Sequence, residues 1–378
     1  MHTIRSGRYV ALLLALGAPM LFPVARAAGS DAAGAQPDAT VVEFADFHQQ
    51  TGKHPGGVIL AGDGNYYGTT LAGGRHGQGT IFRVDPDGAV TSLYDFKGEA
   101  DGRQPEGALV QGADGALYGV AQGSIDPNWN NANGVIFRVS LDGRFEAIHT
   151  MAADGSEGFS LNTPLIQGRD GKLYGTARYD PAYMGLVYSV TPDGQYATVA
   201  RFLPGQFGQP WAPPLQADDD HFYLTTTVGG SRNYGGLLLV SRKNGTVTVL
   251  HDFTNQGDGA YPQGPLVFDA ARESVWGVTY KCVYRYRIES GVLGTVACLG
   301  KDWPGAVTLG PDGTHFYVVG QDKVHSIAPD GTLQTIARLP SRSSLFQQMI
   351  LDPAGALVGT TTKSGAKDAG TVFKIEGY

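Results

Sequence analysis

The chain has 378 residues, with 35 acidic and 28 basic side chains that give a formal net charge of −7. This acidic balance argues against nucleic-acid binding, because neutralising phosphates requires clustered lysine and arginine. Only two cysteines are present, and no third or fourth ligand lies at a spacing that would complete a zinc site with them. We therefore expect neither a metal nor a cofactor.

The N-terminal segment has the pattern of a secretory signal over residues 1–27. Two arginines precede an apolar run at residues 9–22, and residues 25–27 offer a small-x-small cleavage site. The run is too short to span a membrane comfortably as an uncleaved anchor. Cleavage near Ala27/Ala28 would remove three arginines and no acidic residue, which takes the net charge from −7 to −10. We expect a periplasmic or secreted protein whose residues 28–40 form a disordered polar tail.

After this tail, one phrase recurs seven times. Its fullest copy runs from Gly57 to Phe96 and consists of four short β runs separated by turn signals. One copy is too small to bury its own apolar face, so neighbouring copies must stack around a shared core. The second β run is the easiest to trace, and its central positions are 67, 118, 174, 223, 276, 317 and 358. Intervals of 41 to 56 residues with four strands per copy predict a β-propeller rather than a solenoid.

The connections within the phrase are of two kinds. Asp-Gly or Asn-Gly pairs such as Asp63-Gly64 and Asp87-Gly88 join the first run to the second and the third to the fourth. These pairs suit tight hairpins because glycine adopts positive φ without a Cβ clash. The other two connections vary in length and content, and they must lie on the opposite face of the disc. Function usually resides on variable loops held by a rigid scaffold, so we expect the ligand site on that face.

The two ends of the repeat array complement each other. The last copy stops at Tyr378 after its third β run, and residues 41–47 match a fourth run such as residues 91–96. An outer strand supplied from the N-terminus would close the ring and remove an exposed sheet edge. We therefore predict an all-β, seven-bladed β-propeller of four-stranded blades at residues 41–378, closed by residues 41–47. Six or eight blades would require that the fifth or sixth copy be miscounted.

The two cysteines flank a hairpin of the fifth copy. Cys282 and Cys298 are equally distant along the chain from Ser290, so an antiparallel ladder would place them opposite each other. In an exported protein this favours a cross-strand disulfide, and two free buried thiols are the alternative. A closed loop of this size would add about 3 kcal/mol of stability.

The variable loops carry aromatic side chains interleaved with basic ones. Aromatic rings stack on sugar faces while arginine and lysine bind carboxylates, so this composition fits an acidic or neutral glycan. The alternative is a solvated rim in which the aromatic side chains only pack the loops together. The ligand-binding candidates are Trp129, Tyr183, Trp211, Tyr261, Lys281 and Trp303.

No catalytic sequence motif is present, although the same loops hold groups able to act as acids and bases. Two histidines of the first copy could converge as an acid/base pair. In a lyase acting on uronate polysaccharides, an arginine would neutralise the carboxylate while a tyrosine or histidine moves the protons. The catalytic candidates are His54, His76, Arg178, Tyr179, Arg232 and Tyr234.

The repeated phrase, Leu-Tyr-Gly-Thr-Thr followed by Gly-Thr-Ile-Phe-Arg-Val and Asp-Gly, resembles the GloVer (Gloeo/Verruco) tandem repeat of exported bacterial proteins. The resemblance is carried by Tyr66–Asp87, Leu117–Asp142, Leu173–Asp193 and Leu357–Ile375. It implies an exported β-propeller and supplies no catalytic residues, because the shared positions are those of turns and core. Members often end in an anchoring tail, and because the sequence stops at Tyr378 directly after a β run, we do not expect surface anchoring.

Together these features predict an exported, monomeric propeller that binds a ligand, with a glycan as the leading candidate, through its variable-loop face. We expect no nucleic-acid partner and no membrane anchor after signal cleavage. Two alternatives stay open on the same face. One is a polysaccharide lyase acting by β-elimination, and the other is a protein–protein scaffold that uses Trp129, Trp211 and Trp303 as anchors.

Overall fold

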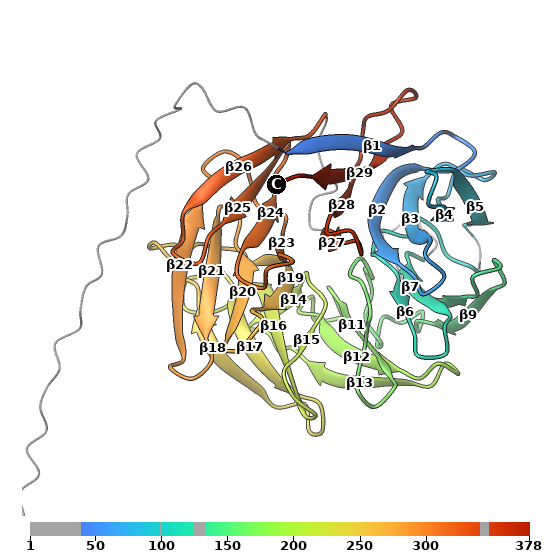
Figure 1. Cartoon of the computed structure of the whole chain (residues 1–378). Helices are drawn as coiled ribbons and strands as arrows, with labels where there is room; N and C mark the ends of the chain where they lie inside the picture. The colour runs from blue at the N-terminus through green and yellow to red at the C-terminus, as the bar shows by residue number, and fades with distance from the viewer. Residues whose placement is uncertain (1–38, 99, 124–133, 341–347) are drawn as a thin grey trace, which may run out of the picture. The chain divides into compact units, whose positions relative to one another are not determined.

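Seven antiparallel sheets form a ring in the computed structural model of the chain, which describes residues 39–98, 100–123, 134–340 and 348–378 (Figure 1). The described ranges contain strands and no helix. In blades 1 to 3, 5 and 6 the strands lie side by side in sequence order, and in blade 7 the N-terminal strand β1 lies outside β29. The predicted all-β class and the seven-bladed propeller are therefore confirmed.

The blades are numbered in chain order. Blade 1 contains β2 (Lys53–Leu60), β3 (Tyr66–Ala72), β4 (Thr80–Val84) and β5 (Val90–Asp95). Blade 2 contains β6 (Val110–Gln111), β7 (Leu117–Ala121), β8 (Val135–Val139) and β9 (Phe145–Thr150). Blade 3 contains β10 (Ile166–Gln167), β11 (Leu173–Ala177), β12 (Leu186–Val190) and β13 (Tyr196–Arg201). Blade 4 contains β15 (Leu215–Gln216), β16 (His221–Val228), β17 (Gly236–Ser241) and β18 (Val247–Asp252). Blade 5 contains β19 (Gln263–Phe268), β20 (Ser274–Val278), β21 (Cys282–Arg287) and β22 (Val292–Cys298). Blade 6 contains β23 (Ala306–Leu309), β24 (Phe316–Val319), β25 (Lys323–Ile327) and β26 (Leu333–Arg338). Blade 7 contains β27 (Ile350–Leu351), β28 (Leu357–Thr361), β29 (Thr371–Glu376) and β1 (Thr40–Asp46). Blade 4 also carries the short strand β14 (Gly208–Pro210), which pairs with β16.

The N-terminal strand completes blade 7. β1 pairs antiparallel with β29, so that Thr40 lies opposite Glu376 and Asp46 lies opposite Thr371. This is the predicted closure, shifted by one residue from the predicted range. The hydroxyl of Thr360 in β28 donates a hydrogen bond of 2.6 Å to the carbonyl of Gly56 in β2, which joins blade 7 to blade 1.

Each position of the repeated Tyr-Gly-Thr phrase has a distinct structural role. In blade 2 the Tyr118 hydroxyl donates to the carboxylate of Asp114 at 2.9 Å, which ties the second strand to the preceding Asp-Gly turn. Gly119 lies opposite Phe137 in the ladder, and a Cβ added there would come within 2.5 Å of the ring. In blade 3 the Thr176 hydroxyl donates to the carbonyl of Ala212 in the next blade at 3.2 Å. The phrase therefore specifies the turn, the packing within a blade and the contact between blades.

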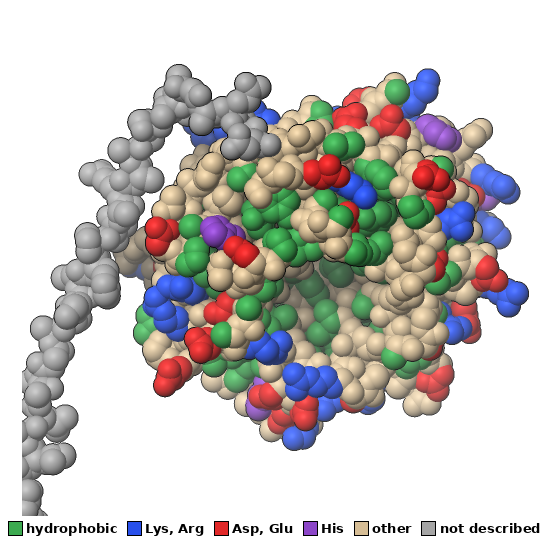
Figure 2. Space-filling view, viewed as in Figure 1, with side chains coloured by type: hydrophobic (Ala, Val, Ile, Leu, Met, Phe, Trp, Pro, Cys, Tyr) green, Lys and Arg blue, Asp and Glu red, His purple; other side chains and the backbone are tan. Residues whose placement is uncertain are grey.

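The hydrophobic core is shared between neighbouring blades. Tyr118 and Ile136 of blade 2 pack in one cluster with Leu165 and Tyr188 of blade 3. This is the stacking that one small copy needs in order to bury its apolar face. Figure 2 shows one face of the ring, which is hollowed at its centre, with hydrophobic side chains around the hollow.

The hairpin of blade 5 carries the predicted covalent link. Cys282 in β21 lies directly opposite Cys298 in β22, and the two residues form a disulfide. Blade 5 lacks the Asp-Gly or Asn-Gly turn pairs that blades 1 to 4 and blade 6 have. The cross-link therefore reinforces a blade whose hairpins have weaker turn signals.

Candidate functional site

A cavity of about 290 Å³ lies where segments from five blades and one loop of blade 7 meet. Each of blades 1 to 5 contributes residues that precede or begin its first strand. These segments all belong to the fourth-to-first connections, which lie on the face of variable loops. The polar and aromatic side chains of the wall are those of His54, Glu106, Asn162, Thr163, Trp211 and Thr362.

A repeated backbone conformation occurs in and next to this wall. In four blades a residue other than glycine has positive φ immediately before a proline; the residues are His54 (56°), Gln104 (45°), Gln209 (55°) and Tyr261 (53°). Each donates its backbone N–H to a carbonyl in a loop of the preceding blade, as His54 does to Ala369 at 2.8 Å. Such residues rarely adopt the left-handed region, and strained positions of this kind cluster at functional sites.

A polar chain crosses the floor of the cavity from blade 3 to blade 2. The Ser160 hydroxyl donates to Oδ1 of Asn162 at 2.9 Å, and the Asn162 side chain hydrogen-bonds the Glu106 carboxyl. Because its oxygen already accepts a bond, Asn162 presents its amide N–H groups to Glu106. Burial raises the pKa of Glu106, and the bond from Asn162 opposes that rise. The pair offers a donor and an acceptor side by side in a half-buried setting.

An aromatic wall stands beside this pair. The guanidinium carbon of Arg178 lies 3.4 Å from the centroid of the Trp211 ring, which is a cation–π stack. Arg178 forms no ion pair with a carboxylate of the described residues, and its Nε is buried without a hydrogen-bond partner among them. Burial lowers the pKa of Arg178. The stack therefore uses a partly desolvated cation to fix the orientation of the indole.

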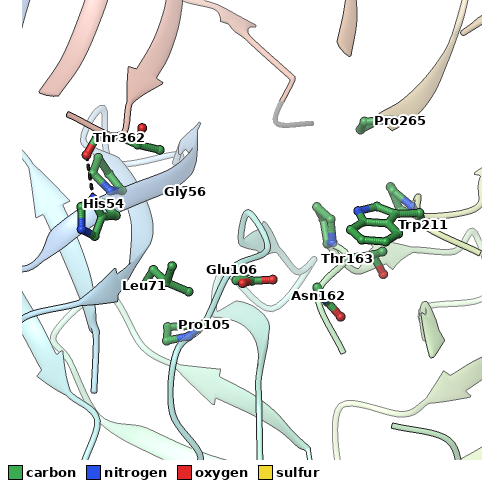
Figure 3. A pocket seen from close by; sticks show the side chains of 13 residues that line it. His54, Gly56, Leu71, Pro105, Glu106, Asn162, Thr163, Trp211, Pro265 and Thr362 are labelled. Carbon is green, nitrogen blue, oxygen red and sulfur yellow. Dashed lines mark hydrogen bonds between the residues drawn. The ribbon is translucent and has the colours of Figure 1, made fainter. Parts of the chain in front are cut away.

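The imidazole of His54 lies across the cavity from Trp211 (Figure 3). Its Nδ1 is 2.7 Å from the carbonyl oxygen of Thr362, which can only accept, so Nδ1 carries the proton. In the neutral ring Nε2 is then a hydrogen-bond acceptor. Figure 3 shows Glu106 between the His54 side and the side formed by Asn162 and Trp211. The cavity thus combines an aromatic face with acceptors and donors from three blades.

The repeat phrase and the fold now place the chain among known proteins. A family model for the Gloeobacter/Verrucomicrobia repeat matches residues 32–184 and 162–297. The chain belongs to this family. No curated protein matches the sequence.

Solved structures similar to this member of the Gloeobacter/Verrucomicrobia repeat family share its fold at low sequence identity. The extracellular domain of a protein assigned as a hybrid two-component system from B. thetaiotaomicron has a TM-score of 0.65 at 14% identity, over 89% of this chain and 40% of that chain. This chain therefore spans about two fifths of that protein's length. An oligogalacturonate lyase from Vibrio parahaemolyticus has a TM-score of 0.58 at 11% identity, over 90% and 98% of the two chains. A protein assigned as a 6-phosphogluconolactonase from Bacteroides fragilis has a TM-score of 0.54 at 15% identity, over 84% and 94%.

The structure does not gather the six catalytic candidates in one pocket. Of the six, the cavity wall contains only His54. His76 and Arg232 are exposed on loops of blades 1 and 4. Tyr179 lies beside Arg178, whose guanidinium carbon is 4.9 Å from its ring centroid. The sixth candidate, Tyr234, packs edge-on against Tyr261 at 5.4 Å.

The ligand-binding candidates divide into a wall residue and a rim. Trp211 lines the cavity. Tyr183, Tyr261 and Trp303 are 64%, 40% and 38% exposed on the surrounding loops, and Lys281 is exposed beside them. The last candidate, Trp129, lies outside the described residues.

Sequence reasoning missed Glu106, Asn162 and Thr163. It selected loop residues by aromatic and basic character, and these three are neither. A signal was available, because a proline recurs in or shortly before the first strand in successive copies of the Gloeobacter/Verrucomicrobia repeat, as at Pro55 and Pro105. The residues next to these prolines are the ones that reach the cavity.

Two further observations concern metal binding and membrane spans in the described part of this family member. It holds no group of three or more His, Cys, Asp or Glu side chains placed to bind a metal ion. Across the same ranges, no helix has the length and apolar character needed to cross a membrane.

Proposed function

We propose that this chain is an exported glycan-binding propeller that takes one neutral sugar residue into the cavity. The observation that carries this proposal is the Glu106–Asn162 pair beside the Trp211 ring. A sugar presents an apolar C–H face for stacking and vicinal hydroxyls that both donate and accept hydrogen bonds. The paired carboxyl and amide match such hydroxyls, and the indole matches the ring face. A volume of about 290 Å³ is at the small end for ligand sites, which suits a single sugar ring.

The charge of the cavity favours a neutral ligand over a uronate. Glu106 is a carboxyl group set into the floor, and in its ionised form it repels a ligand carboxylate. Arg178, the cation nearest to the aromatic wall, is stacked on the Trp211 ring. Glu106 can hydrogen-bond the hydroxyls of a neutral sugar in either protonation state, since a protonated carboxyl donates and an ionised one accepts.

The two alternative functions receive less support. A lyase would need an arginine and a proton-transferring side chain around one ligand position, and His76 and Arg232 lie on exposed loops. A protein scaffold anchored by tryptophans would need them clustered in one desolvated patch. Trp211 lines the cavity while Trp303 stands on the rim, so these two anchors serve different surfaces.

Export from the cytoplasm is part of the proposal. It is supported by the signal pattern of residues 1–27 and by the disulfide between Cys282 and Cys298, because disulfides persist in oxidising compartments. The similar domain from B. thetaiotaomicron is extracellular. Monomeric behaviour in solution stays a prediction.

The test is calorimetric titration of the full-length chain with a panel of neutral mono- and oligosaccharides. We expect at least one member to bind, with affinity falling at least tenfold in Trp211→Ala and in Asn162→Ala. His76→Ala, an exposed loop variant on the same face, is the matched control and should bind as the wild type does. Binding that is unchanged in both cavity variants, or a panel with no binder at all, would refute the proposal.

A further inference from the structure

The exposed aromatic side chains of the described residues all stand on one face of the propeller. They are Tyr183, Tyr261, Tyr280 and Trp303, and each belongs to a second-to-third or fourth-to-first connection. Three of them come from consecutive connections around blades 4, 5 and 6. With two exposed lysines they form what we call the rim patch: Tyr261, Tyr280, Lys281, Lys301 and Trp303.

Backbone hydrogen bonds hold the loops of the rim patch together. The N–H of Tyr280 donates to the carbonyl of Ala260 at 3.0 Å, which brings Tyr280 beside the loop of Tyr261. The N–H of Leu299 donates to the carbonyl of Lys281 at 2.9 Å, which brings in the loop of Trp303. The rings of Tyr280 and Trp303 lie 4.5 Å apart between centroids and are 36% and 38% exposed. The aromatic surface is therefore fixed in place and open to solvent.

The rim patch is basic although the whole chain is acidic. Lys281 and Lys301 form no ion pair with any carboxylate of the described residues. The nearby carboxylates of the same loops are turned toward histidines and not toward these lysines: Asp302 accepts from His325 at 2.8 Å, and Asp258 contacts His251 at 3.1 Å. Two unpaired ammonium groups thus flank the rings on a chain of net charge −7. This local charge selects an anionic partner.

The rim patch adjoins the wall of the cavity. The backbone at Gly305, two residues after Trp303, lies close to the backbone at Gly264. A Cβ added to Gly264 would overlap the carbonyl oxygen of Gly305. Gly264 in turn precedes Pro265, which lines the cavity. A chain-like ligand seated in the cavity therefore meets the rim patch when it leaves over blades 5 and 6.

We propose that the rim patch is a second glycan subsite, which binds carboxylate- or sulfate-bearing units of a polysaccharide. The inference rests on the proposed function, since the polysaccharide bound here continues from the sugar in the cavity. Rings stack on sugar faces and ammonium groups bind the anionic substituents. A lipid surface or an apolar protein partner fits less well, because the exposed large aliphatic side chains of the described residues (Val42, Leu203, Val249 and Val292) lie outside the rim patch.

The test is affinity electrophoresis of the full-length chain in gels containing polygalacturonate, dextran sulfate or unmodified dextran. The wild type should be retarded by the two anionic polymers, and added salt should weaken the retardation. Tyr280→Ala/Trp303→Ala removes the rings at constant charge, and Lys281→Glu/Lys301→Glu reverses the charge. Both should weaken binding to anionic polymers at least tenfold, with melting temperatures showing that the variants are folded.

The matched control for charge is Lys172→Glu/Arg287→Glu, two exposed residues on the opposite, hairpin face. It makes the same change in net charge and should bind the anionic polymers within twofold of the wild type. Equal losses in the control and in the rim-patch variants would overturn the inference, as would no retardation of the wild type. Calorimetry with neutral saccharides on Trp211→Ala and Asn162→Ala reports on the cavity, so unchanged binding in these variants combined with retention of the rim-patch effects would reject the cavity and support the rim patch.

Discussion

Replacing Gly119 by alanine should destabilise the propeller, because this glycine is covered by an aromatic ring. A Cβ at this position would lie 2.5 Å from Cζ of Phe137 and 2.8 Å from Cδ2 of Leu109. Both side chains are buried, and the Phe137 ring is backed by Phe96 at 5.5 Å and Phe145 at 5.4 Å, so it cannot slide away freely. Overpacking of a core costs about 1–3 kcal/mol, and replacing a strand glycine by alanine returns about 0.5–1 kcal/mol of backbone entropy. We expect a net loss of about 1–2 kcal/mol.

The measurement is urea unfolding followed by near- and far-ultraviolet circular dichroism, with coincident transitions as the check of two-state behaviour. Gly294→Ala is the matched control, because Gly294 is also a strand glycine but a Cβ there meets no atom within 4 Å. It should be neutral or slightly stabilising. In a Phe137→Leu background, Gly119→Ala should cost less, because the smaller side chain leaves room for the methyl group. Equal midpoints for Gly119→Ala and the wild type would show that ring packing is not the reason for this glycine.

Three further perturbations test other parts of the fold. Replacing Cys282 and Cys298 by serine should cost about 3 kcal/mol by the loop-closure estimate, and reducing agent should then no longer shift the urea midpoint. Thr360→Val removes the 2.6 Å hydrogen bond that joins blade 7 to blade 1, and it should lower the urea midpoint by the equivalent of about 1–2 kcal/mol. Burial tends to raise the pKa of Asp302, but hydrogen bonds from His325 and a backbone amide outweigh it and hold the pKa below its usual range. The ionised carboxylate therefore stabilises the fold above the unfolded pKa of about 3.9, and this contribution disappears as the pH falls through the lower folded value. Asp302→Asn should accordingly flatten the acid side of a plot of melting temperature against pH.

The fold could be predicted from the sequence because the repeated residues act locally. The Asp114-Gly115 turn and the Gly119 position depend on contacts within one blade. The tyrosine-to-aspartate bond recurs in blades 1 to 3, and an aromatic ring covers the strand glycine in five blades of the described residues. The disulfide was predictable for a related reason, since the register of a single hairpin places Cys282 opposite Cys298. The extra strand β14 was not predicted, because its residues lie in an irregular linker and pair with β16 of their own blade, a partner that no turn signal indicates.

The candidate site could be predicted only as a face. Glu106 and Asn162 belong to different blades and meet through the curvature of the ring, which no local pattern encodes. Aromatic and basic residues are conspicuous in a sequence, and most of those chosen lie on the rim rather than in the cavity. Trp211 was a ligand-binding candidate and lines the cavity. Arg178 was a catalytic candidate, and its stack on Trp211 could not be foreseen because it depends on the approach of blades 3 and 4.

The backbone of the cavity wall also constrains how a ligand can bind. His54 in the wall and Gln209, two residues before Trp211, have positive φ and donate their N–H groups to loop carbonyls of the preceding blades, at 2.8 and 2.6 Å. Moving either segment would break a hydrogen bond between blades and abandon a conformation that only the surrounding structure enforces. A ligand therefore meets a wall that is already ordered, and little of its binding free energy is spent on ordering loops. Because the wall joins neighbouring blades, a ligand bound in the cavity should stabilise the whole ring rather than one loop.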